Sequence, residues 1–151
     1  SEQWRAGRRM LRYYDQGQTP IVFHLGDHDP SGIDMTRDNA DRLAMFIGDD
    51  VEVRRLALNM DQIEQYNPPP NPAKEVDSRF LGYMELYGRE SWELDALEPQ
   101  VLSDLIENAV LSVRDDDEYD RVVEQEDAYI KSLASVEANW TRVVKFLEKK
   151  R

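Results

Sequence analysis

The sequence predicts an α/β fold, in which a small parallel sheet is flanked by helices and followed by a C-terminal helical extension. An uninterrupted apolar run over residues 20–26 indicates a buried strand. A helical periodicity over residues 31–47 and a second strand pattern over residues 51–58 follow it. A strand, helix and strand joined by short turns form a βαβ unit with parallel strands. A long apolar periodicity over residues 118–149 indicates the extension.

An amphipathic helix is expected ahead of the first strand, over residues 2–15. Trp4, Leu11 and Tyr14 fall on one stripe of this helix, and the neighbouring stripe carries four arginines, Arg5, Arg8, Arg9 and Arg12. These arginines form either a solvated basic face or a set of phosphate contacts.

After the second strand we expect a short helix to Tyr66, and then a rigid loop over residues 67–72. The prolines of this loop remove backbone donors and favour extended geometry, so no regular structure is expected there. Further helices are expected over residues 77–87 and 99–113, and Ser31 is expected to cap the helix that starts there.

The chain divides by pattern into three parts. Residues 1–66 are expected to form the α/β core, and residues 67–98 a proline-rich loop and acidic segment packed on it. Residues 99–151 are expected to form the extension, as a helical hairpin or a coiled coil.

The composition limits the classes of function. The absence of cysteine excludes disulfides, thiolate zinc sites and a cysteine nucleophile, and it fits a cytoplasmic location. A mean hydropathy of −0.71 and the lack of a long apolar run predict a protein that does not contact a membrane. The net charge of −12 opposes tight binding to a phosphate backbone, so we expect nucleic-acid contacts to come from residues outside this chain. The chain does not begin with methionine and is expected to be a fragment.

Two aspartates, Asp27 and Asp29, directly follow the first strand. On an extended backbone their side chains point the same way, and ligands of open α/β sheets bind beyond the carboxyl ends of the strands. Carboxylate oxygens favour a hard cation, Mg²⁺ or Mn²⁺. The alternative is that Asp29 opens the turn with Pro30 and that Asp27 caps a nearby amide.

The segment Ile-Val-Phe-His-Leu-Gly-Asp27-His-Asp29-Pro-Ser-Gly resembles the Asp-x-Asp strand end of the Toprim domain. Toprim domains occur in topoisomerases, bacterial primases and some nucleases, and the Asp-Pro-x-Gly continuation is similar to the topoisomerase VI branch. The later stretch, from Asn-Pro-Pro-Pro to Trp-Glu-Leu-Asp-Ala-Leu, resembles uncharacterised Toprim-like proteins of bacteria and phages. The resemblance implies that Asp27 and Asp29 bind magnesium in a domain that cleaves or transfers nucleic-acid phosphodiesters.

The Toprim pattern also requires a glutamate at the end of an earlier strand, and Glu2 does not match that position. The fragment by itself is therefore expected to be inactive, and no catalytic residue is assigned. Glu93, Asp95 and Asp34 are the internal acids that could supplement the site; Glu93 and Asp95 could equally be acids at the start of a helix. His24 and His28 are expected to be structural.

Two other functions fit the pattern. A phosphotransferase of the haloacid-dehalogenase type also places Asp-x-Asp after a strand, although here Pro30 and Ser31 alter the context of that motif. The second of these functions is that of a non-catalytic scaffold, which forms a homo-oligomer through the helix over residues 118–149. Its seam consists of Tyr119, Val122, Glu126, Tyr129, Leu133, Val136, Trp140, Val143 and Leu147.

Overall fold

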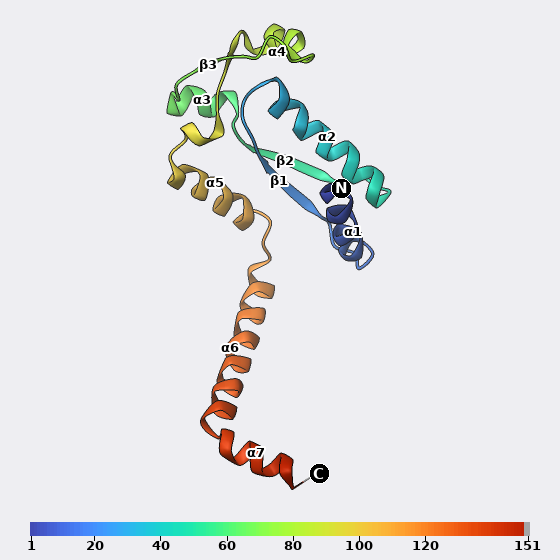
Figure 1. Cartoon of the computed structure of the whole chain (residues 1–151), viewed down its shortest axis with the longest axis vertical. Helices are drawn as coiled ribbons and strands as arrows, with labels where there is room; N and C mark the ends of the chain where they lie inside the picture. Colours follow the sequence, from blue (N-terminus) through green and yellow to red (C-terminus); the bar gives the residue numbers. More distant parts are fainter. Residues whose placement is uncertain (150–151) are drawn as a thin grey trace. The chain divides into compact units, whose positions relative to one another are not determined.

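The computed structural model describes residues 1–149, and the chain divides into two units, one of residues 1–110 and the other starting at Leu111. The first unit contains a two-stranded parallel sheet (Figure 1). Strand β1 (Ile21–Leu25) pairs with β2 (Glu52–Ala57), with Val22 opposite Val53. Helix α2 (Pro30–Ile47) connects the two strands. The predicted α/β class and the parallel βαβ unit are confirmed.

Helix α1 (Glu2–Tyr14) packs against α2 and covers the amino ends of the strands. Gly7 lies so close to Phe46 that a Cβ at position 7 would overlap the Phe46 side chain. Apolar side chains fill this contact: Ala6, Met10, Leu11, Val22, Leu43, Ile47, Val51 and Val53. The expected helix over residues 2–15 is therefore present, but its predicted apolar stripe is only partly buried. Leu11 packs in this core, whereas Trp4 and Tyr14 are exposed.

A second apolar cluster lies beyond the carboxyl ends of the strands. It joins helix α3 (Met60–Tyr66), the short 3₁₀ helix η1 (Leu94–Ala96) and helix α5 (Pro99–Leu111) to the end of the sheet. Its buried members are Ala57, Leu58, Ile63, Trp92 and Leu97. This packing fixes the segment around Trp92 next to the end of β1.

The proline-rich stretch is not wholly irregular. Strand β3 (Asn71–Pro72) pairs antiparallel with β4 (Glu90–Ser91) on either side of helix α4 (Phe80–Tyr87), so the prediction of no regular structure over residues 67–72 is wrong. The short ladder tolerates Pro72 because a proline lacks only the donor, and an edge position does not need it.

Helix α2 begins earlier than expected. Its N-cap is Asp29, not Ser31, because the Asp29 side chain accepts a hydrogen bond from the Gly32 amide. A Cβ on Gly32 would overlap the Asp27 carbonyl oxygen, so a glycine permits the close approach of the turn to the helix.

The second unit contains α6 (Asp116–Ala138) and α7 (Trp140–Glu148), and the prediction of one continuous helix over residues 118–149 is wrong. The break falls at Asn139, whose side-chain amide donates to the Ser135 carbonyl at 2.9 Å. Asparagine competes with the helical backbone in this way, which explains why the helix ends there. Among the described residues, no helix combines the length and the apolar character needed to cross a membrane.

Candidate functional site

The two aspartates of the predicted metal motif lie at the carboxyl end of β1, and both are partly buried. Asp29 Oδ1 accepts a hydrogen bond from the Gly32 amide at 2.5 Å. Asp27 Oδ1 accepts one from the Leu94 amide at 2.8 Å, across 67 residues of sequence. Asp27 and Asp29 therefore both cap backbone amides, as the alternative to a metal site expects, and each cap uses only one oxygen of its carboxylate.

Glu93 lies beside these aspartates because the bond from Leu94 to Asp27 brings its segment to the end of β1. The charge of Asp27 is the main cause of a raised Glu93 pKa, and burial, a hydrogen bond to Asp27 and the charge of Asp29 add to it. Lys74 opposes the shift. We call Asp27, Asp29 and Glu93 the carboxylate cluster. Within the described chain, no arginine, lysine or histidine forms an ion pair with any of its members.

Arg55 holds the backbone behind the carboxylate cluster. It lies on β2 and faces α2, and its guanidinium donates to the carbonyl oxygens of Asp27 at 2.7 Å, Gly26 at 2.8 Å and Gly32 at 2.9 Å. Further bonds go to the Leu58 carbonyl and to the Thr36 hydroxyl. One side chain thus connects the end of β1, the start of α2 and the end of β2.

The guanidinium of Arg55 is half-buried, and its hydrogen-bond acceptors are all neutral. Burial lowers its pKa from the usual value for arginine, while the charges of Asp27 and Asp29 oppose that shift. Arginine remains charged under these conditions. Arg55 therefore supplies one positive charge behind three carboxylates and leaves the cluster with an excess of negative charge.

His28 points away from the aspartates into a ring of aromatic side chains. Its Nδ1 lies 2.8 Å from the Tyr83 hydroxyl, and the rings of Tyr87 and Trp92 lie edge-on to it. Burial is the main reason that the pKa of His28 is lowered. His24 bonds through Nδ1 to the Thr36 hydroxyl at 2.8 Å. Both histidines are held by contacts within the protein, in agreement with a structural role.

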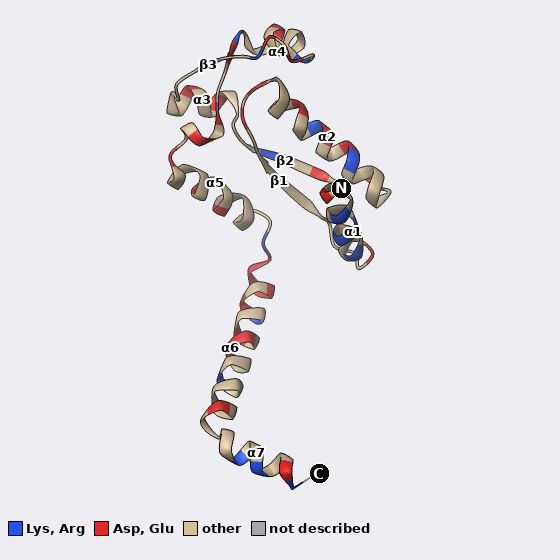
Figure 2. Ribbon diagram, viewed as in Figure 1, with Lys and Arg blue, Asp and Glu red and all other residues tan. Residues whose placement is uncertain are grey.

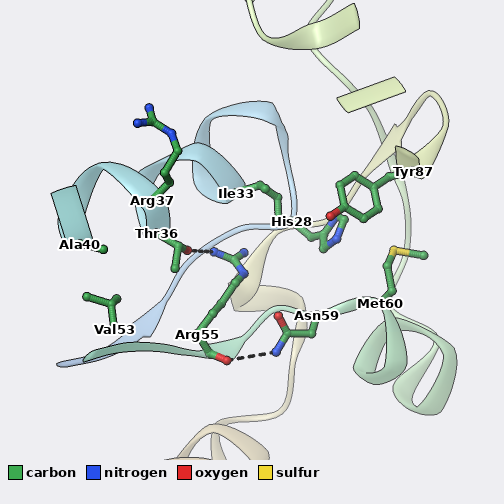
Figure 3. A pocket seen from close by; sticks show the side chains of 10 residues that line it. All are labelled: His28, Ile33, Thr36, Arg37, Ala40, Val53, Arg55, Asn59, Met60 and Tyr87. Carbon is green, nitrogen blue, oxygen red and sulfur yellow. Dashed lines mark hydrogen bonds between the residues drawn. The ribbon is translucent and has the colours of Figure 1, made fainter. Parts of the chain in front are cut away.

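An open pocket of about 580 Å³ lies on the α2 side of β2 (Figure 3). Arg55 points across it to Thr36, and the Asn59 side chain bonds to the Arg55 carbonyl at 3.3 Å. The lining residues are His28, Ile33, Thr36, Arg37, Ala40, Val53, Arg55, Asn59, Met60 and Tyr87. None of the three clustered carboxylates lines this pocket, so the cluster and the pocket are separate features.

The other predicted site residues lie elsewhere. Asp34 forms ion pairs with Arg37 at 2.8 Å and Arg79 at 3.2 Å, and those arginines lower its pKa. Asp95 is exposed in η1, and among the described residues it has no hydrogen bond or ion pair with the cluster.

The arginine stripe of α1 is exposed and lies along the C-terminal half of α2, where Gln3 bonds to Asn39. Asp29 caps the opposite end of α2. The distance along the axis of α2 from Asp29 to Phe46, which α1 contacts, is therefore roughly 25 Å. Arg5, Arg8, Arg9 and Arg12 therefore do not surround the carboxylate cluster.

In the part of the chain that the structure describes, no group of three or more acidic or histidine side chains forms a cage that could hold a metal ion. A magnesium ion does not require such a cage, because it usually keeps several waters and takes one or two carboxylates together with substrate phosphates. The donor set of the carboxylate cluster, oxygen only, fits that ion.

Comparisons with protein-family models, with curated proteins and with solved structures found no match to this chain. The fold and the site by themselves define the class of protein: an α/β domain with a carboxylate cluster at a strand end.

Replacing Arg55 should destabilise the protein much more than replacing its neighbour. Arg55→Met removes the donor to the Asp27 and Leu58 carbonyl oxygens and should lower the free energy of unfolding by about 3 kcal/mol. The matched control Arg54→Met removes an exposed ion pair with Glu52 and should have a much smaller effect on the free energy of unfolding. Urea unfolding of the two variants measures both values, and equal losses would contradict the role of Arg55.

The repulsion at Glu93 should be visible in the pH dependence of stability without metal. Because the pKa of Glu93 is raised above its usual 4.5, the ionised side chain disfavours the folded state at neutral pH. Glu93→Gln should therefore increase stability at neutral pH, by at most about 1 kcal/mol since the side chain is exposed. The gain should shrink as the pH falls through the raised pKa and vanish below the usual value.

Thermal melts of the original protein and of Glu93→Gln in EDTA, from neutral pH to below the usual glutamate pKa of 4.5, test the expectation. The titration of His28 occurs in both proteins and cancels in the difference. Glu64→Gln, which alters an exposed acid on α3, is the control and should show no such trend. A Glu93→Gln protein that is less stable than the original at neutral pH would contradict the arrangement.

Proposed function

We propose that the carboxylate cluster binds Mg²⁺ or Mn²⁺ and that the chain is the metal-binding part of a Toprim-like domain that acts on nucleic-acid phosphodiesters. The observation that carries the proposal is the placement of Glu93 beside Asp27 and Asp29 at the end of a parallel strand, where the Leu94 amide bonds to Asp27 at 2.8 Å. The raised pKa of Glu93, caused mainly by the charge of Asp27, agrees with this placement. Acidic side chains that repel one another bind a cation more readily than isolated ones, because the cation removes the repulsion.

Each residue of the cluster has a distinct part in this proposal. Asp29 is oriented by its bond to the Gly32 amide, which engages one of its two carboxylate oxygens. Asp27 is held by the Leu94 amide. Glu93 adds a third negative charge to those of Asp27 and Asp29. When bound, the ion would screen the charge of phosphoryl oxygens.

Glu93 is proposed to add negative charge beside the metal ion and not to act as a general acid or base. In the Toprim pattern the residue with that role comes from an earlier strand, whereas among the described residues the element that precedes β1 is helix α1. The chain by itself is therefore proposed to bind metal and phosphate without cleaving the phosphodiester.

The arginine stripe of α1 supports a nucleic acid as the ligand, although it lies apart from the cluster. Its four arginines are exposed on the same unit as the cluster. A separation of roughly 25 Å along α2 corresponds to about seven base pairs of duplex. A nucleic acid bound at the cluster could thus place a more distant phosphate against α1.

The proposal predicts DNA binding that depends on magnesium. A short fluorescent DNA duplex should bind about tenfold more tightly in magnesium chloride than in EDTA at equal ionic strength, a difference of about 1.4 kcal/mol. Asp27→Asn should remove the magnesium dependence, because it removes one carboxylate charge and keeps an acceptor for the Leu94 amide. Fluorescence anisotropy measures these affinities.

Glu64→Gln provides the matched control, since it removes one negative charge from an exposed surface outside the cluster. This variant should keep the full magnesium dependence. Affinity that is the same with and without magnesium, or an Asp27→Asn protein that behaves like the original, would contradict the proposal.

A non-catalytic scaffold is the second candidate function, and one observation favours it. The large apolar side chains of α6 and α7 are extensively exposed, with Tyr129 at 60% and Leu133 at 69%. Exposed apolar surface of this extent is typical of an interaction site. The two functions are compatible, because they use different units of the chain.

A further inference from the structure

The second unit carries an apolar stripe along its two helices. On α6 it consists of Tyr119, Val122, Tyr129, Leu133 and Val136, and on α7 of Trp140, Val143 and Leu147. All but Val143 are more than 40% exposed. The three- and four-residue spacing is that of helices that pair side by side. Glu126 interrupts the stripe on α6, and the break at Asn139 separates its α6 part from its α7 part.

The charges beside this stripe divide sharply along the sequence. Residues 115–127 contain eight acids and one arginine, a net charge of −7. Residues 128–151 contain six basic residues and two acids, a net charge of +4. Figure 2 shows acidic residues concentrated in the N-terminal part of α6 and basic residues on α7. The two ends of the second unit are thus of opposite charge.

We infer that two copies of this chain pair antiparallel through the apolar stripe, with the two-fold axis near Leu133. An antiparallel pair places the acidic segment of each copy beside the basic segment of the other. A parallel pair places acid beside acid, which is unfavourable at these distances. Charge complementarity therefore selects the antiparallel orientation.

A second copy fits this surface because the pattern is complementary to itself. In a two-fold interface every contact occurs twice, so one stripe with oppositely charged ends satisfies both sides. Such pairing also lowers the net charge next to each acidic segment. This interface is independent of the carboxylate cluster and of its proposed function.

Sedimentation equilibrium of the full chain tests the association. The expected mass is twice the 17.7 kDa of the chain, and the dissociation constant should increase with salt. Leu133→Glu should give a monomer, because it places a charge at the centre of the stripe. Leu86→Glu, at an equally exposed leucine on α4, is the matched control and should remain dimeric.

A monomeric mass for the original chain would overturn the inference, whether the stripe then packs on residues 1–110 or stays exposed. A dimer that survives Leu133→Glu, with the helical circular dichroism unchanged, would also overturn it.

Spin labels measure the orientation directly, because the chain contains no cysteine and a single one can be introduced at will. In an antiparallel pair, labels on Ser132→Cys lie close to the two-fold axis and should be less than about 25 Å apart. Labels on Asp117→Cys lie 16 residues from Leu133 and should be about 48 Å apart. Short distances for both labels indicate a parallel pair and would overturn the inference.

Discussion

The first unit depends on the guanidinium of Arg55, which holds the carbonyl oxygens where three segments meet. The last backbone bond between the two strand ends runs from the Leu58 amide to the Gly26 carbonyl oxygen, and the turns begin directly beyond it. Arg55 donates to Gly26 and Asp27 after β1, to Gly32 in α2 and to Leu58 after β2. Buried carbonyl groups need such partners, and a planar guanidinium with five donors can serve several at once.

The position of the carboxylate cluster follows from this arrangement. Arg55 holds the Asp27 carbonyl oxygen, the Asp27 carboxylate accepts a hydrogen bond from the Leu94 amide, and that second bond places Glu93 beside Asp27. The capping bond of Asp29 then fixes the start of α2. Structural bonds and an excess of negative charge thus coexist in the same three side chains. The capping roles and a metal-binding role do not exclude each other, since each cap uses one carboxylate oxygen.

The βαβ unit could be predicted because apolar runs and turn residues are local signals, and the carboxylates at the end of β1 followed from it. The proximity of Glu93 could not be established from sequence, because it depends on packing around Trp92 and Leu97. Arg55 was missed, although it follows Val53 at the two-residue spacing of one strand face, the face that meets α2, and an arginine at that position was an available signal. The break at Asn139 was missed because the apolar spacing continues across it, while the backbone there is controlled by one side-chain bond.

Paramagnetic broadening by Mn²⁺ in amide NMR spectra tests the metal site most directly. Substoichiometric Mn²⁺ should broaden the Gly32 and Leu94 amide signals first, because both amides bond to cluster carboxylates. The Asp27→Asn variant should lose this selectivity. Broadening confined to the acidic start of α6, with Gly32 and Leu94 unchanged, would contradict the existence of a cation site at the end of β1.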